Sequence, residues 1–203
     1  MLSALDKISY GLFILSVKNG EKDNACIINT VVQSCLSPEK LTFSVNRSNF
    51  TNELLSKNPF FTVSVISEKA DFEIFKHFGF VSGRDTDKFK DFTSVIKTTN
   101  GTLAINKGTN AYISGKVTDS LDLGSHTVFT ADITETKILN EDNSVTYDFY
   151  HKHIKPQNKI ENRNQTVWRC EICGYEYVGE ELPSDFICPL CKHPASDFEI
   201  CKK

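Results

Sequence analysis

Residues 170–191 read CEICGYEYVGEELPSDFICPLC and hold two Cys-x-x-Cys pairs separated by 14 residues. Each pair fits a tight turn whose backbone N–H groups point at the sulfurs and offset the charge of the thiolates. Together the pairs predict one tetrahedral four-sulfur metal site. Zinc and a single iron both suit that ligand set. The predicted ligands are Cys170, Cys173, Cys188 and Cys191.

The residues around the two pairs favour iron over zinc. Residues 167–201 carry seven carboxylates against two basic side chains, whereas a zinc ribbon used for binding tends to expose basic ones. Aromatic rings keep water away from sulfur ligands, which helps to set a redox potential. The alternative is a zinc site that only stabilises the fold. The rings in this segment are Trp168, Tyr175, Tyr177, Phe186 and Phe198.

Three stretches of the segment resemble a rubredoxin: WRCEICGY (168–175), ELPSDFICPLC (181–191) and SDF (196–198). The resemblance spans residues 167–200 and includes more than the cysteines. It implies one iron held by four thiolates that cycles between the ferric and ferrous states.

Composition and charge exclude several classes of protein. The net charge is −3, and residues 1–166 hold 19 acidic and 19 basic side chains, so nucleic acid is not an expected partner. No run approaches 18 apolar residues and the start lacks the pattern of a secretory signal, so we expect a cytoplasmic protein outside the membrane. Seven cysteines, four of them in the two pairs, suit metal ligation and reduced thiols better than a disulfide framework.

The rest of the chain is dominated by predicted strands, with short helices between them. Polar, basic residues with few core positions follow Tyr150 and indicate a linker. We therefore expect a mainly β domain at 1–150, a linker at 151–166 and the cysteine module at 167–203. The predicted strands are 10–17, 25–32, 40–45, 60–66, 111–119 and 126–139, and the predicted helices are 49–58 and 70–78.

No GxGxxG or GxxxxGK[ST] motif is present, so the usual dinucleotide and triphosphate cradles are not expected. Small polar residues gather instead near predicted strand ends, in IINTVVQSC (27–35) and NRSNFT (46–51). Hydroxyls and backbone N–H groups at a helix start bind phosphate well. Plain capping of the 49–58 helix by Ser48 or Asn49 is the simpler alternative.

In their order along the chain, several stretches resemble the flavin reductase family of FMN-binding split barrels. They are YGLFILSV (10–17), IINTVVQSC (27–35), VNRSNFTNELL (45–55), HFGFVSGRDTDKF (77–89), GSHTVFTADI (124–133) and VTYDFYHK (145–152). The resemblance implies a split β-barrel with FMN bound across a homodimer interface.

The resemblance also assigns site residues. Asn29, Thr30, Val31 and Val32 would line the flavin ring and ribityl chain, and Ser48, Asn49, Thr51 and Lys88 would hold the phosphate or nearby polar groups. Gly79, Arg84 and His126 would lie around the flavin or the nicotinamide, and Tyr147 or Tyr150 would cover the ring. Ser34 and Asn46 complete the set; where many relatives carry a double proline, this chain has SCLSPEK (34–40), which implies an altered loop.

The arrangement as a whole is similar to the high-molecular-weight rubredoxins of anaerobic bacteria. It implies an enzyme in which NADH or NADPH reduces FMN, FMN reduces the iron, and a flavodiiron protein that reduces oxygen or nitric oxide accepts the electrons. No catalytic acid, base or nucleophile is expected, because the flavin accepts the hydride. Two alternatives stay open: an electron carrier reduced by a separate reductase, and a flavin sensor or storage protein with structural zinc.

Overall fold

The computed structural model describes residues 4–20, 22–156, 166–172, 175–188 and 193–201. The chain divides into two compact units, Met1–Lys155 and Pro156–Lys203, and each is described by itself. The first unit stays helical through Ile154. The domain limits expected at residues 150 and 166 remain predictions, and residues 157–165 lie outside the described part of the chain.

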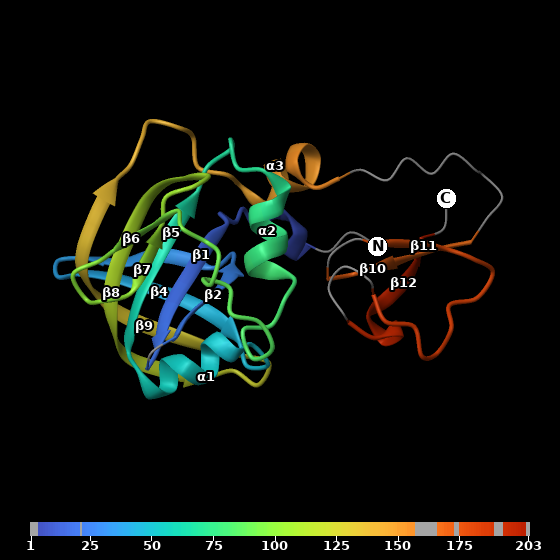
Figure 1. Ribbon diagram of the computed structural model, residues 1–203, viewed down its shortest axis with the longest axis horizontal. Helices are drawn as coiled ribbons and strands as arrows, with labels where there is room; N and C mark the ends of the chain where they lie inside the picture. The colour runs from blue at the N-terminus through green and yellow to red at the C-terminus, as the bar shows by residue number, and fades with distance from the viewer. Residues whose placement is uncertain (1–3, 21, 157–165, 173–174, 189–192, 202–203) are drawn as a thin grey trace. The chain divides into compact units, whose positions relative to one another are not determined.

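An antiparallel sheet of seven strands forms the first unit, in the order β2-β1-β5-β8-β9-β4-β3 (Figure 1). A two-stranded ribbon, β6 with β7, accompanies it. The mainly β class expected from the sequence is confirmed. The strands are β1 (Phe13–Asn19), β2 (Lys22–Ile28), β3 (Val31–Leu36), β4 (Glu39–Asn46), β5 (Phe60–Ile66), β6 (Val95–Lys97), β7 (Leu103–Ile105), β8 (Thr109–Asp122) and β9 (His126–Ile138).

The short connection between β2 and β3 determines the shape of the sheet. These two strands lie at opposite ends of the strand order, yet only Asn29 and Thr30 separate them in the chain. The sheet must therefore curve until its two ends come close together, which makes it a barrel that is split between β2 and β3. The prediction of one continuous strand at 25–32 is wrong at this point, because its two halves pair with different neighbours, β1 and β4.

Phenylalanine rings fill the inside of the barrel. Phe43 lies with its ring centroid 4.9 Å from that of Phe61 and 5.6 Å from that of Phe129. All three are buried, together with Leu15 and Val17 of β1. Alternate residues of a strand point to opposite faces of the sheet, so these positions define the inner face. Burying one such ring stabilises the fold by about 1.5–3 kcal/mol relative to leaving it exposed.

A second core lies outside the barrel, under helix α2 (Phe72–Gly79). Ile74, Phe75 and Phe78 of α2 are buried against outward-facing residues of β1 and β2, among them Ile14. The helix starts where the Asp71 carboxylate accepts a hydrogen bond from the N–H of Ile74 at 3.2 Å, a typical N-cap. The apolar stripe expected over 70–78 therefore faces the sheet.

The remaining helices of the first unit are short. Helix α1 (Phe50–Lys57) buries Leu54 and Leu55 against the barrel and ends two residues before Pro59. The others are a 3-10 helix (Ala4–Lys7), α3 (Tyr147–Phe149) and the π-helix that continues it (Tyr150–Ile154). Within the described residues, no helix has both the length and the apolar character needed to cross a bilayer.

The second unit is built on a three-stranded antiparallel sheet, in the order β11-β10-β12. Its strands are β10 (Val167–Cys170), β11 (Glu176–Val178) and β12 (Phe198–Cys201), and a 3-10 helix (Ala195–Asp197) leads into β12. The central strand β10 ends on Cys170, so the sheet positions the first cysteine of the module.

Candidate functional site

Two of the four predicted metal ligands, Cys170 and Cys188, lie in the described part of the second unit, and both are fully buried. The N–H of Cys170 donates to the carbonyl of Tyr175 at 2.8 Å, and the N–H of Cys188 donates to the carbonyl of His193 at 2.8 Å. In both cases the acceptor lies five positions after the cysteine in the sequence. Two buried cysteines with the same backbone bond suit a tetrathiolate iron. Cys173 and Cys191 lie outside the described residues.

Aromatic rings pack together beside the cysteines, as the sequence predicted. Phe186 is central: its ring centroid lies 4.9 Å from Tyr177, 5.4 Å from Phe198 and 6.3 Å from Tyr175. The indole N–H of Trp168 donates to the carbonyl of Gly179 at 3.2 Å. Phe198 is buried and the other four rings are half-buried, so this packing covers the small interior of the unit.

At one corner of the barrel the structure gathers five predicted flavin residues, Thr30, Asn46, Ser48, Asn49 and His126, which we call the polar corner. Asn46 ends β4 directly opposite His126, the first residue of β9. The Thr30 hydroxyl lies 3.2 Å from both the carbonyl oxygen and the backbone nitrogen of Ser44, which holds Thr30 against the same end of β4.

The start of α1 at the polar corner suits a phosphate group. The side-chain oxygen of Asn46 accepts hydrogen bonds from the N–H and the hydroxyl of Ser48, each at 2.8 Å. Asn49 is the N-cap residue of α1, but its side chain makes no capping bond. Plain capping by Asn49 is therefore not what the structure shows, and the first-turn N–H groups keep no side-chain cap. Such a helix start attracts an anion.

Strand β3 brings the predicted ring-contacting residues to the edge of the barrel. Asn29 and Val31 are half-buried, and Val31 packs against the inner core. Val32 is 59% exposed on the opposite face. Ser34 is exposed, and its hydroxyl donates to the carbonyl of Lys40 at 3.4 Å. The side chains of Val31 and Val32 thus lie on different faces of the sheet, and only that of Val32 offers an open apolar surface.

Four further predicted residues surround β2 instead. Thr51 is buried, and its hydroxyl oxygen accepts a hydrogen bond from the side-chain amide of Asn24 at 2.8 Å. Gly79 packs closely on β2, since a Cβ added there would lie 3.2 Å from a side-chain carbon of Ile27. Arg84 and Lys88 belong to the loop that follows α2. The structure therefore separates this β2 group from the polar corner and from the residues on and beside β3.

Lys88 is only 3% exposed, and its ammonium donates to the carbonyls of Ala25 at 2.8 Å and Phe78 at 2.9 Å. These bonds tie the loop after α2 to β2. Burial lowers the pKa of Lys88 to about 8, and the nearby thiol of Cys26 opposes this shift. An ammonium has three N–H donors, so at most one remains for a ligand. The phosphate role of Lys88 stays a prediction.

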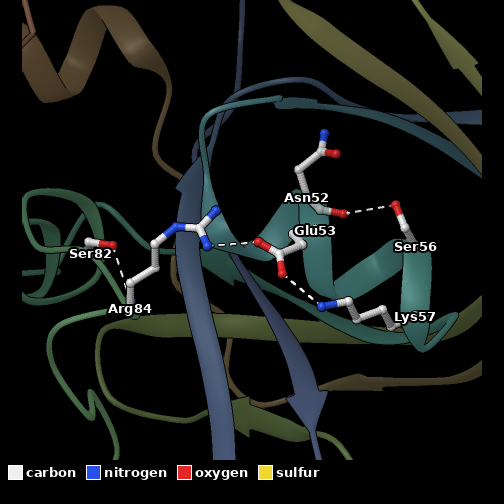
Figure 2. A network of polar contacts seen from close by, with 6 residues as sticks. All are labelled: Asn52, Glu53, Ser56, Lys57, Ser82 and Arg84. Carbon is white, nitrogen blue, oxygen red and sulfur yellow. Dashed lines mark hydrogen bonds and ion pairs between the residues drawn. The ribbon is translucent and has the colours of Figure 1, made fainter.

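Arg84 is anchored to α1, as Figure 2 shows. Its guanidinium donates to the Glu53 carboxylate at 2.7 Å and lies 4.8 Å from the ring centroid of Phe50. Glu53 also accepts a hydrogen bond from Lys57 at 2.7 Å. The hydrogen bonds from Lys57 and, to a smaller extent, from Arg84 hold the pKa of Glu53 below its usual value. In this arrangement Arg84 fastens the loop after α2 to α1, and its role in binding a cofactor stays a prediction.

The two predicted ring-covering tyrosines lie in different surroundings. Tyr147 begins α3 and is 41% exposed, and its N–H donates to the carbonyl of Tyr10 at 2.8 Å. Tyr150 is buried in the outer core, with its ring centroid 4.5 Å from that of Phe75. Of the two, Tyr147 is the one with an exposed ring.

Sequence reasoning missed Asn24 and Glu53, which position the predicted residues Thr51 and Arg84. Asn24 carries only a weak signal, because it is a polar amide directly before the apolar run ACII of β2 (residues 25–28) and is buried like the first residues of that run. Glu53 carries none, since a carboxylate in the first turn of a short helix is common.

The split barrel with its polar corner, and the small unit with its buried cysteines, define a two-domain oxidoreductase of the flavin and iron type. Residues 5–156 match the flavin reductase like domain, and the chain belongs to that family. Residues 168–199 match the rubrerythrin, rubredoxin-like domain. The expected join of a flavin reductase to a rubredoxin is thereby confirmed.

A curated relative matches the chain over nearly its whole length, and others match part of it. The chain is 28% identical over 225 residues to the high molecular weight rubredoxin of Moorella thermoacetica, covering 97% of each chain. It is 30% identical over 152 residues to a ferric-chelate reductase (NAD(P)H) of Archaeoglobus fulgidus, covering 74% of this chain and 88% of that one. A solved FMN-binding protein of Thermus thermophilus has the same fold, with a TM-score of 0.65 and 16% identity over 90% of this chain and 93% of that one.

Buried Lys88 predicts a distinct dependence of stability on pH. Its folded pKa of about 8 lies below the ordinary value of 10.5, so the unfolded chain binds more protons between these pH values. The cost of burying the charge is fully present below about pH 8 and disappears toward pH 10.5. We expect the free energy of unfolding to rise with pH across this window, by up to about 3 kcal/mol relative to Lys88→Met.

Urea unfolding followed by circular dichroism at several pH values measures this difference. The exposed Lys90 of the same loop provides the control, and Lys90→Met should show the same pH dependence as the wild type. A Lys88→Met profile parallel to that of the wild type would contradict the buried, partly neutralised ammonium.

Proposed function

We propose that this chain oxidises NADH or NADPH with bound FMN and passes the electrons singly through the cysteine-bound iron to a separate acceptor. The observation that carries the proposal is the pairing, in one chain, of a flavin reductase barrel with a module whose cysteines are buried beside packed aromatic rings. When bound, the flavin supplies the step from a two-electron donor to a one-electron acceptor.

The protein's part in this reaction is to bind and orient. Exposed Ser48 and Asn46, next to the uncapped start of α1, supply hydroxyl, amide and backbone donors for the FMN phosphate. Val32 offers an apolar contact for the ring on the open side of β3. No side chain has to move a proton for hydride transfer, which agrees with a site built from small polar residues.

We infer that the acceptor docks on the cysteine loops of the second unit. Ile172 lies two positions after buried Cys170 and Ile187 directly before buried Cys188, and they are 49% and 52% exposed. Exposed Glu171, Glu180 and Asp185 add negative charge to this unit. An apolar spot among carboxylates suits a partner that presents a basic rim, because complementary charge accelerates encounter. A flavodiiron protein is the acceptor class that the likeness to fused rubredoxins implies.

Reducing conditions suit this chemistry. Thiolate ligands and the unpaired thiol of Cys26 require a compartment that does not form disulfides. We therefore infer a cytoplasmic location.

A second copy of the chain would complete the flavin site. Leu121 lies opposite Val128, whose neighbour Phe129 points into the barrel, so Leu121 and Val128 face outward. Leu121 is 62% exposed, and Val32 of β3 is exposed on the same side of the sheet. Burial of this apolar surface would stabilise a homodimer.

We expect sedimentation velocity of the full chain to give the mass of a dimer, and Leu121→Lys to shift it toward the monomer. The matched control is Leu36→Lys, at the far end of β3 and 79% exposed. A monomeric wild type would contradict the dimer.

Removal of the Ser48 hydroxyl tests the phosphate site. We expect Ser48→Ala to weaken FMN binding by about 1.5–3 kcal/mol, because it removes a hydrogen bond to a charged group. Ser56→Ala, a similar change near the other end of α1, provides the control and should leave the affinity unchanged. Fluorescence titration of the flavin-free protein with FMN measures both, and equal affinities would exclude Ser48 as a phosphate ligand.

Anaerobic titration with NADH and NADPH tests the reaction itself. We expect the flavin and iron absorption to bleach together after about 1.5 equivalents per chain, since two electrons fill the flavin and one fills the iron. A flavin that neither nucleotide reduces would favour the carrier alternative, and a zinc-filled module in protein from an iron-replete source would favour the sensor alternative.

A cysteine variant separates the two halves of the reaction. Cys188→Ser should abolish the iron absorption and leave reduction of the flavin nearly unchanged, because Cys188 lies in the second unit. Cys201→Ser, in the same unit but outside the two pairs, should keep both signals. Loss of flavin reduction in Cys188→Ser would show that the units do not act independently.

A further inference from the structure

A small cavity of about 90 Å³ lies between the start of β2 and the loop at residues 82–87, and we call it the β2 pocket. It is separate from the polar corner residues. Its lining includes Asp23 and Asn24 of β2, Phe50 of α1, and Gly83, Asp85 and Asp87 of the loop.

Asn24 directs an unpartnered oxygen toward this pocket. The residue is 3% exposed, and its amide nitrogen donates to the Thr51 hydroxyl oxygen at 2.8 Å. The other side-chain atom, Oδ1, is buried and has no hydrogen-bond partner among the described residues. A Cβ added to the pocket residue Gly83 would lie 1.8 Å from this oxygen.

Asp23 contributes a second unpartnered oxygen. Its Oδ1 is buried and, within the described part of the chain, accepts no hydrogen bond. Burial raises the pKa of Asp23, nearby Lys18 lowers it, and Asp87 and then Lys97 act on it more weakly, Asp87 raising it and Lys97 lowering it. Arg84, which also lines the pocket, is already bound to Glu53. Both unpartnered atoms in the pocket are thus acceptors, and buried acceptors call for a positive partner or a donor.

We propose that the β2 pocket binds a hard divalent cation, Ca²⁺ or Mg²⁺, through the side-chain oxygens of Asp23, Asn24 and Asp87. Carboxylate and amide oxygens are the ligands these ions prefer, and water completes their coordination. A water occupies about 30 Å³ of liquid volume, so the pocket has room for an ion and few waters.

The site is weak by its composition. The described residues hold no group of three or more His, Cys, Asp or Glu placed to bind a metal. The protein ligands of the proposed ion are therefore only two carboxylates and one neutral amide. Few charged ligands correspond to dissociation constants on the order of 10⁻⁴ to 10⁻³ M. A cation here joins β2 to the loop that carries Arg84 and Lys88, and it therefore stabilises the loop that packs on α1.

Calorimetric titration of the full iron-loaded chain with CaCl₂ and with MgCl₂ tests the proposal. These hard ions do not compete for thiolate ligands, so the iron stays in place. We expect saturable binding of at least one of the two ions, and about tenfold weaker binding in Asp23→Asn and in Asp87→Asn. Asp23→Asn keeps the shape of the side chain, and in Asp87→Asn the retained oxygen still accepts from the N–H of Phe89.

Asp119→Asn is the matched control, because Asp119 is an exposed carboxylate on β8 outside the pocket. It should bind the ion as the wild type does. No binding of either ion by the wild type overturns the proposal. Equal weakening in the control and the pocket variants also overturns it, since binding would then follow the overall charge of the protein. Unchanged affinity in both pocket variants overturns it as well.

Discussion

The first unit depends on one constraint, the two-residue passage from β2 to β3 through Asn29 and Thr30. Because this passage joins opposite ends of a seven-stranded sheet, the sheet has to close on itself. Closure directs Phe43, Phe61 and Phe129 inward. The same passage sets Thr30 against the end of β4, so the fold and the polar corner share one cause.

The two cofactor regions differ in how far apart in the sequence their residues lie. The cysteine module could be predicted from spacing alone, since the two cysteines of each pair are three positions apart and the aromatic residues lie within one stretch of 31 residues, from Trp168 to Phe198. The flavin region draws on strand ends that are far apart in the sequence, such as Asn46 and His126. Alternation of apolar and polar residues placed β9 within one residue of its observed bounds, because it is a local signal.

The features that the sequence did not predict depend on contacts between residues far apart in the chain. The break inside residues 25–32 follows from which strands pair, and an apolar run carries no mark of that choice. From the sequence, Lys88 resembles a solvated cation of a charged loop, yet its ammonium is buried and donates hydrogen bonds to the carbonyls of Ala25 and Phe78, which lie far from it in the sequence. Likewise, the role of Arg84 depends on Glu53, which lies 31 positions away.

Trp168, held by its bond to the carbonyl of Gly179, is the only tryptophan of the chain and belongs to the second unit. Its emission consequently reports on the cysteine-bearing module alone. Because the strand that carries Trp168 also carries Cys170, indole emission is a probe of the metal-binding unit to which the barrel, which has no tryptophan, contributes nothing.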